Sequence, residues 1–230
     1  MADQQKAEVQ DDGFLSRDPG AIALLSLQGL CGVALVVGVK TVPAYYGLNL
    51  IAHPVAAIRC ALALTLPTVV VAYTLLYIFS SRPRPVWRCI GSGLLSLPLG
   101  TVVIALLALA FGAPTSLQYA SRTLHWAFLM SVLVVLPAAI VLGSSWPDWQ
   151  RIFAFTRPRG GLERAICIPA HGALIGAWVG AFPMPLDWER PWQEWPISCT
   201  YGAAGGYLVG LTISILLQFL LPKDVRSKVD

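Results

Sequence analysis

The residues best suited to chemistry lie in one short stretch near the C-terminal end of the chain. Residues 187–195 contain three acids, one arginine and three tryptophans, whereas the 230-residue chain as a whole is only 12% charged. Asp187, Glu189 and Arg190 can neutralise one another, and a carboxylate here could also serve as a general base. The stretch is therefore the first place to look for a catalytic or binding site.

A catalytic site needs more groups than this stretch supplies. Two-metal phosphoryl transfer requires several carboxylates or histidines converging on ions about 4 Å apart. The only other acid or histidines expected on the same face of the molecule as Asp187 and Glu189 are Glu194, His53 and His125. The chain contains no G-x-S-x-G, P-loop or H-E-x-x-H pattern, and its five cysteines lack C-x-x-C spacing. We expect no catalytic residue, no metal site and no cofactor.

Two interpretations of the stretch remain. It could be a self-paired cap at the membrane interface, where tryptophans suit the headgroup level and a proline opens a short turn. The interpretation we favour is a contact with a partner protein or lipid headgroups, made by Asp187, Trp188, Glu189, Arg190, Pro191, Trp192 and Trp195.

The elements that position this stretch are expected to be membrane helices. The chain is 56% hydrophobic with a mean hydropathy of +0.66, and about 20 apolar residues suffice to cross the hydrocarbon as a helix. We predict an all-α, polytopic membrane helix bundle with a disordered tail at 1–20 and a polar tail at 222–230. Its six transmembrane helices are expected at about 21–39, 60–79, 90–111, 124–143, 165–182 and 197–221.

The distribution of basic residues predicts the orientation. Six spans put both termini on one side, and twelve of the sixteen lysines and arginines fall there. The other side holds Lys40, Arg59, Arg122 and Arg190. Because the basic side is normally cytoplasmic, both termini are expected in the cytoplasm and residues 187–195 on the lumenal face.

Glycines recur at fourfold spacing in the last two predicted helices. Such series let helix backbones approach closely in lipid, either on each other or on a partner. The predicted helix-packing residues are Gly172, Gly176, Gly180, Gly202, Gly206 and Gly210.

Other polar or aromatic residues in the chain have less specific interpretations. His171, two residues after Pro169, could be functional, or could bond a carbonyl that the proline frees. In the loop at 144–164, Trp146, Trp149 and Phe153 fit a short interfacial helix with Arg151 and Arg157 projecting elsewhere. A solvated loop fits that segment equally well.

The segment GAFPMPLDWERPWQEWPISC resembles the C-terminal signature of the PIG-F family. The resemblance is strong from Gly176 to Cys199, weaker from Gly112 onward and around residues 149–153, and limited to hydropathy over the first hundred residues. It implies a multi-pass protein of the endoplasmic reticulum membrane that stabilises a catalytic ethanolamine-phosphate transferase chain, of the PIG-O or PIG-G type, in glycosylphosphatidylinositol (GPI) anchor synthesis. This chain would then be an accessory subunit in contact with membrane lipids, and not an enzyme.

Two rival functions stay open from sequence. A lipid transporter or scramblase would need a continuous polar path, for which Gln28, His171 and Gln218 are the candidates. A polytopic transferase would use Asp187 or Glu189 as its base.

Overall fold

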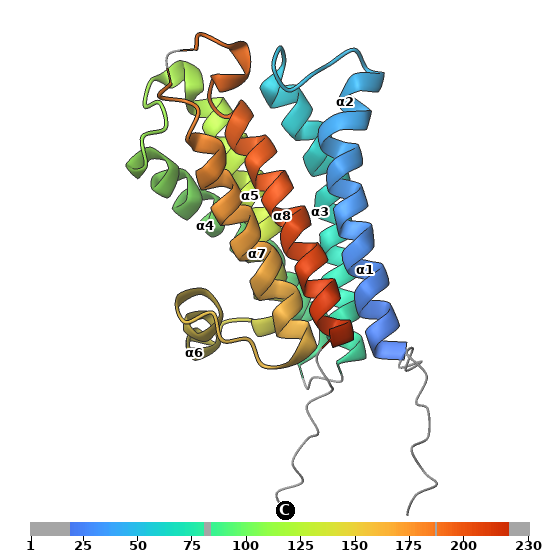
Figure 1. The fold of residues 1–230 in the computed structure, drawn as a ribbon. Helices are drawn as coiled ribbons and strands as arrows, with labels where there is room; N and C mark the ends of the chain where they lie inside the picture. Colours follow the sequence, from blue (N-terminus) through green and yellow to red (C-terminus); the bar gives the residue numbers. More distant parts are fainter. Residues whose placement is uncertain (1–18, 81–83, 187, 221–230) are drawn as a thin grey trace, which may run out of the picture.

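The computed structural model describes residues 19–80, 84–186 and 188–220, and within them all the regular structure is helical (Figure 1). Most of the expected N-terminal tail, the C-terminal tail and Asp187 therefore lie outside the described residues. The long helices are α1 (Pro19–Val36), α3 (Pro54–Phe79), α4 (Val86–Ala110), α5 (Leu117–Leu142), α7 (Gly160–Ala181) and α8 (Ile197–Leu220). The shorter ones are α2 (Val42–Tyr45), α6 (Trp146–Trp149), the π-helical turns Val37–Thr41 and Gln150–Ala154, and the 3₁₀ turn Pro191–Gln193.

Six of these stretches are long and apolar enough to cross a membrane. The first runs from Ile22 to Tyr45, because α1 continues through the π-helical turn into α2. Pro43 explains this wide turn, since a proline lacks the N–H that would bond the carbonyl of Val39. The other five coincide with α3, α4, α5, α7 and α8. The predicted fold class is confirmed.

Several helices begin earlier than hydropathy places them. α3 starts at Pro54 where the sequence suggested residue 60, and α5 starts at Leu117 where it suggested 124. Hydropathy marks the part of a helix that sits in hydrocarbon, whereas backbone hydrogen bonding continues into the polar interface. The same reasoning covers the earlier starts of α4 and α7.

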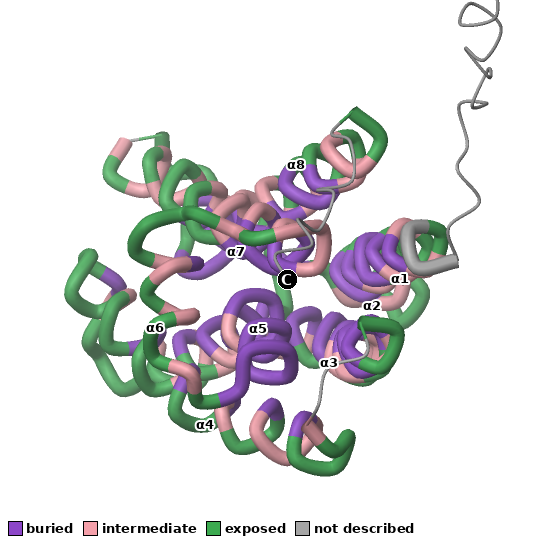
Figure 2. The backbone as a smooth tube through the Cα atoms, turned by 90° about the horizontal axis from the view of Figure 1, so that it is seen from below, coloured by how far each residue is buried: buried purple, intermediate pink, exposed green. Residues whose placement is uncertain are grey.

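Helix α5 forms the centre of the bundle. In the most apolar 18-residue segment of α5, 78% of the segment is buried, whereas the corresponding share is 28–39% in the other five spans. Helices α3, α4 and α7 pack on it, while α1 packs on α3 and α8. Figure 2, seen from the α6 end, shows the buried part of α5 at the centre of the bundle among partly exposed neighbours, whereas the first turns of the helix, around Leu117 and Leu124, are exposed. The start of α1 and the end of α8 lie at the same end of the bundle as α6 (Figure 1).

Candidate functional site

The connection between α7 and α8, residues 182–196, contains the residues singled out above and is called here the tryptophan loop. It lies at the end of the bundle opposite α6 (Figure 1). The two helices that flank the loop, α7 and α8, pack on each other through their glycines. A Cβ atom added to Gly176 would lie 2.9 Å from the Cα of Gly206, and one added to Gly202 would lie 2.9 Å from the Cα of Gly180. Real Cβ atoms essentially never come this close, so the two backbones touch directly.

The shape of the loop is fixed by a glutamine that the sequence reasoning did not single out. Gln193 is 8% exposed, and its Nε2 donates hydrogen bonds to the carbonyls of Pro183 at 2.6 Å and Leu186 at 2.8 Å. Its Oε1 accepts the backbone N–H of Arg190 at 2.9 Å. A glutamine at the third position of a helical turn is a capping pattern, and that pattern could have identified Gln193 in advance.

Trp195 anchors the loop to the bundle. Its side chain is only 6% exposed, its indole N–H donates to the Oγ1 of Thr123 at 2.9 Å, and its ring centroid lies 5.0 Å from that of Trp126. Both partners belong to α5. Trp195 is thus packed in the core and is not exposed for the partner or lipid contact that the sequence suggested.

Glu194 ties the same end of the loop to α5 through an ion pair with Arg122. The hydroxyl of Tyr119 also donates to this carboxylate at 3.4 Å, and the Arg122 guanidinium lies over the Tyr119 ring at 5.1 Å. Arg122 donates further to the carbonyl of Trp195 at 3.4 Å. Glu194 therefore holds the loop on α5, although its side chain remains 44% exposed.

Residues 188–191 of the loop face outward. Trp188 is 55% exposed, and its ring lies 6.0 Å from that of the half-buried Trp192. Glu189, Arg190 and Pro191 are exposed. The expected mutual neutralisation does not extend to Glu189 and Arg190, which form no ion pair with each other or with another described residue. The loop thus presents an indole, a carboxylate and a guanidinium on a fixed backbone.

Glu189 adopts a backbone conformation that is costly for its residue type. Its φ is +49°, in the left-handed region that favours glycine over residues with a side chain. Strain of this kind persists where the surrounding structure fixes the backbone, and it is frequent at functional sites. Here the fixing comes from the Gln193 hydrogen bonds on either side.

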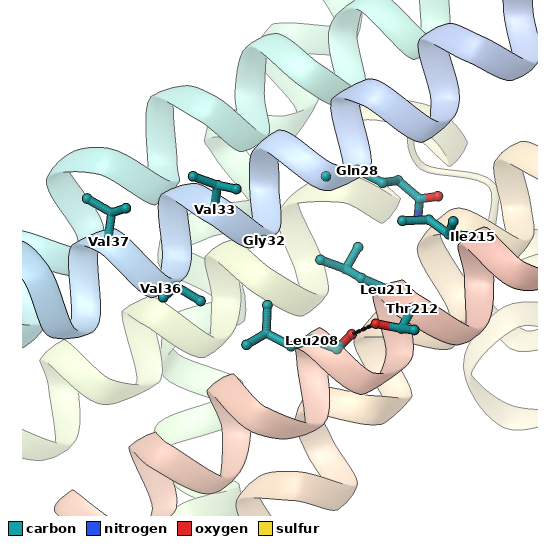
Figure 3. A pocket seen from close by; sticks show the side chains of 10 residues that line it. Gln28, Gly32, Val33, Val36, Val37, Leu208, Leu211, Thr212 and Ile215 are labelled. Carbon is teal, nitrogen blue, oxygen red and sulfur yellow. Dashed lines mark hydrogen bonds between the residues drawn. The ribbon is translucent and has the colours of Figure 1, made fainter.

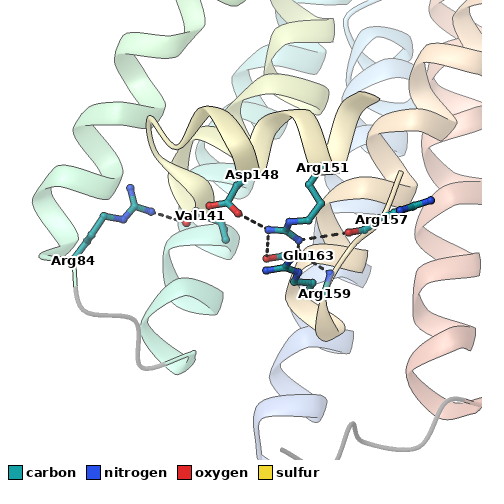
Figure 4. Close-up of polar contacts among 7 residues, drawn as sticks. All are labelled: Arg84, Val141, Asp148, Arg151, Arg157, Arg159 and Glu163. Carbon is teal, nitrogen blue, oxygen red and sulfur yellow. Dashed lines mark hydrogen bonds and ion pairs between the residues drawn. The ribbon is translucent and has the colours of Figure 1, made fainter. Parts of the chain in front are cut away.

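The opposite end of the bundle contains a second polar cluster that sequence reasoning missed (Figure 4). Arg151, which was expected to project elsewhere than Trp146, Trp149 and Phe153, pairs with both oxygens of Glu163 and with Asp148 at 2.5 Å. Glu163 is 4% exposed and also accepts the backbone N–H of Arg159 at 2.7 Å. The hydrogen bond to Glu163 and, to a smaller extent, the hydrogen bond to Asp148 raise the pKa of Arg151 above its ordinary value. The guanidinium holds α6 and the following turn against α7.

The aromatic residues of this segment continue the same attachment. Trp149 and Phe153 stack with ring centroids 5.3 Å apart, and Phe153 stacks in turn on His171 at 5.8 Å. The Trp149 indole N–H donates to the carbonyl of Gly143 at 2.8 Å. Of the two interpretations left open for this segment, the short helix is the one present, and Phe153 in the turn that follows it packs on α7, while Trp146 is exposed.

The contacts of His171 correct the idea that it bonds a carbonyl freed by Pro169. A proline frees the carbonyl four residues earlier, which is that of Ala165. This oxygen instead accepts the hydroxyl of Tyr73 at 2.8 Å and the amide of Gln28 at 3.5 Å. The Nδ1 of His171 lies 2.7 Å from the carbonyl of Cys167 in its own helix.

The polar residues considered for a lipid path are each bonded separately. Gln28 donates to Ser214 at 3.2 Å, and Gln218 donates to the carbonyl of Gly161 at 3.1 Å. Neither contacts His171. Within residues 19–80, 84–186 and 188–220, no three histidines, cysteines or acids gather closely enough to hold a metal ion.

Comparisons with known proteins now add to this geometry. The profile of the GPI biosynthesis protein family Pig-F matches residues 34–215. The chain is 40% identical over 118 residues to the human protein named "GPI ethanolamine phosphate transferase, stabilizing subunit", and equally to its Mus musculus counterpart, covering 51% of this chain and 53% of each relative. It is 36% identical over 176 residues to the "PIGF/3-ketodihydrosphingosine reductase fusion protein" of Schizosaccharomyces pombe, covering 76% of this chain and 34% of the fusion protein. The chain thus spans about half the length of the human and mouse relatives that it matches. No solved structure matches it.

Proposed function

This multi-pass membrane protein belongs to the Pig-F family of GPI biosynthesis proteins, and from that premise we propose that it is a non-catalytic subunit that binds and stabilises a GPI ethanolamine-phosphate transferase. The observation that carries the proposal is the family match over residues 34–215, together with the names of the human and mouse relatives. The catalytic partner would be a chain of the PIG-O or PIG-G type in the endoplasmic reticulum membrane. Both termini would be cytoplasmic and the tryptophan loop lumenal.

The exposed part of the tryptophan loop is the contact we assign to the partner. Tryptophan and arginine are the residues most enriched among those that dominate interface energies. Trp188 is exposed, and the Arg190 side chain has no ionic partner among the described residues. Because Gln193 and Trp195 already hold the backbone, a partner would not need to order the loop, which lowers the entropic cost of binding. Asp187 would belong to the same contact.

Co-purification tests this proposal. We expect Trp188→Ala and Arg190→Gln each to lower the amount of catalytic chain that remains with this protein by more than about tenfold, since truncating a dominant interface residue costs about 2 kcal/mol or more. Activity per remaining complex should change by less than about tenfold. The matched control is Trp87→Ala with Arg88→Gln, an exposed tryptophan and arginine at the other end of the bundle.

Normal amounts of complex with abolished activity would contradict the proposal. Such a result would make the loop part of a reacting site, since losing a general base typically costs about 10²–10⁴-fold in rate. An equal loss of complex in the Trp87 and Arg88 controls would instead contradict the choice of the loop as the contact.

A further inference from the structure

The groove between α1 and α8 is lined mostly by apolar side chains, and its polar groups are already bonded (Figure 3). Gln28 donates to the Oγ of Ser214 at 3.2 Å. The hydroxyl of Thr212 donates to the carbonyl of Leu208 at 2.9 Å. None of the described residues that line the groove is charged, so a charge that lacks a partner has to be sought elsewhere on the bundle.

Such a charge lies near the start of α3, and the function proposed above does not use it. Arg59 is the one charged residue of this 26-residue helix. It is exposed, and no ion pair joins it to any residue that the structure describes. A charged residue in a membrane span is costly and normally has a partner, which makes Arg59 a candidate binding residue.

His125 of α5 holds the Arg59 guanidinium in place. The Nε of Arg59 donates to the Nε2 of His125 at 3.0 Å. This ring nitrogen is therefore the one without a proton, and Nδ1 donates to the carbonyl of Ser121 at 2.7 Å. The four N–H groups on the two Nη atoms of Arg59 bond to no residue that the structure describes. They form the planar fork that fits two oxygens of one phosphate or carboxylate.

The charges around this pair favour an added anion. The imidazole of His125 is neutral, because its Nε2 accepts a hydrogen bond, and it does not balance the charge of Arg59. Arg122, one turn before His125 on α5, already engages Glu194. Among the described residues, the tryptophan-loop end has two acids, Glu189 and Glu194, against four cations: Lys40, Arg59, Arg122 and Arg190.

Arg59 lies at the depth of lipid phosphates. Helix α3 begins with Pro54 at the tryptophan-loop end (Figure 1). Its 26 residues extend about 39 Å, and the hydrocarbon core is about 30 Å thick. A centred helix therefore projects about 4–5 Å beyond the hydrocarbon at each end, and the Cα of Arg59 lies about 7.5 Å from the start. An arginine side chain readily spans the remaining distance of about 3 Å to the headgroups.

The surface of α3 below Arg59 suits an acyl chain. Ala63, Leu66 and Val70 follow the arginine by four, seven and eleven residues, so they form an apolar stripe on the same side of the helix. Ala63 is exposed, and the other two are half-buried. A lipid whose phosphate meets Arg59 could therefore lay one chain along this stripe.

We propose that Arg59, positioned by His125, binds the phosphate of a glycerophospholipid in the leaflet on the tryptophan-loop side, with one acyl chain along Ala63, Leu66 and Val70. The depth of the guanidinium decides between this occupant and a partner helix. A helix would have to carry its own acid to this depth, whereas every phospholipid places a phosphodiester monoanion there. The site is independent of the stabilising role proposed above, which uses the tryptophan loop.

Photolabelling in an uncharged maltoside detergent tests the proposal on the full chain, purified with the polypeptides that stay bound. This detergent contains no phosphate, so a phospholipid can be titrated without competition from the solvent. The probes are phosphatidylcholine with a diazirine in the middle of one acyl chain and a diacylglycerol with the same chain. We expect phosphatidylcholine to label residues 60–71 and to reach half-saturation at a concentration at least about tenfold lower than the diacylglycerol, from contacts worth about 1.4 kcal/mol. Inorganic phosphate at the concentration of the lipid should not displace it.

Variants of the pair separate binding from positioning. Arg59→Gln should raise the half-saturating concentration of phosphatidylcholine at least about tenfold, the scale of a hydrogen bond to a charged group, and should leave diacylglycerol labelling as it was. His125→Phe should raise it about two- to twelvefold, because binding must then immobilise Arg59. His125→Gln, whose side-chain oxygen can accept the same hydrogen bond, should restore binding. The matched control is Arg88→Gln, an exposed arginine at the other end of the bundle.

Four outcomes would overturn the proposal. Equal half-saturation by the two probes would remove the phosphate from the site. Unchanged phosphatidylcholine labelling in Arg59→Gln would remove the guanidinium, and the comparison of the two probes on the unmodified chain decides even if this variant does not fold. Labelling of residues 60–71 no stronger than that of the exposed residues of α4 would mean that the lipid belongs to the general annulus. Labelling that appears only after a bound polypeptide is removed would assign Arg59 to that polypeptide.

Discussion

At the scale of single residues, two side chains do most of the positioning, and neither was an obvious candidate. Gln193 fixes the tryptophan loop through three backbone groups. Arg151 fixes the segment at the opposite end of the bundle through Glu163 and Asp148. Both act by satisfying polar groups that are shielded from water, where an unmade hydrogen bond costs about 1–3 kcal/mol.

The first prediction concerns Gln193. Gln193→Met keeps the length of the side chain but removes its three hydrogen bonds, so the backbone amides of residues 184–190 should exchange with solvent about 5- to 100-fold faster, from a loss of roughly 1–3 kcal/mol. Hydrogen exchange followed by mass spectrometry measures this directly. Gln118→Met, at an exposed position, is the control. Unchanged exchange in the loop would mean that Trp195 alone holds it.

A second prediction concerns the buried ion pair. Arg151→Met should destabilise the purified chain by about 3–5 kcal/mol, because it leaves the buried Glu163 carboxylate without its charged partner. Glu163→Gln should cost less, because Arg151 keeps its ion pair with Asp148. The double variant should cost less than the sum of the two, since it leaves neither charge. Measuring the free energy of unfolding in detergent for the unmodified chain, the two single variants and the double variant completes the double-mutant cycle. Strict additivity would show that the two residues act independently.

At the scale of elements, the glycine faces of α7 and α8 explain why two helices joined by a fifteen-residue loop form one platform. Lipid offers no hydrophobic drive for helices to associate, so contact area and close approach must supply it. The smooth faces give both. They also set the separation of the loop stems, and through it the geometry of the proposed partner contact.

The prediction at this scale compares two neighbouring glycines of α8. Gly206→Leu should lower the yield of folded protein severely, because a Cβ there would lie 2.8 Å from the Cα of Gly176. Gly205→Leu should be tolerated, since nothing lies within 4 Å of its Cβ position. Size-exclusion profiles and thermal unfolding of the two variants give the comparison. Equal yields would mean that the helices tolerate separation.

The sequence allowed the elements to be predicted better than their contacts. Six apolar stretches and a fourfold glycine spacing are local patterns, and each corresponds to a helix or a helix face in the structure. The Trp195–Thr123 bond and the Arg122–Glu194 pair join residues about seventy positions apart, and no local pattern encodes such partners. For the same reason, Trp195 could not be separated in advance from the outward-facing residues of the loop.

At the scale of the whole molecule, the bundle has two dissimilar ends. One end carries the tryptophan loop, where Trp188, Glu189 and Arg190 face outward. The other end carries α6 and a cluster of arginines, of which Arg84 caps α5 by donating to the carbonyl of Val141 at 2.5 Å (Figure 4). The proposed lumenal contact is consistent with this asymmetry, because it would use only one end of the bundle.

The orientation of this asymmetry gives the last prediction. Among the described residues, six arginines (Arg84, Arg88, Arg151, Arg157, Arg159 and Arg164) belong to the end that carries α6, the start of α1 and the end of α8, against four basic residues at the other end. Positively charged loops remain cytoplasmic during insertion. Ser144 and Thr115 are exposed residues just beyond the two ends of α5, so cysteines placed there report on opposite faces of one helix. An impermeant thiol reagent applied to sealed microsomes should label Ser144→Cys at once and Thr115→Cys only after the membrane is opened. Among the described native cysteines, four are buried and Cys60 is partly buried, so the unmodified chain measures the background. The reverse pattern would put the tryptophan loop in the cytoplasm, where it could not meet a lumenal partner, and the proposed contact would have to be abandoned along with the orientation.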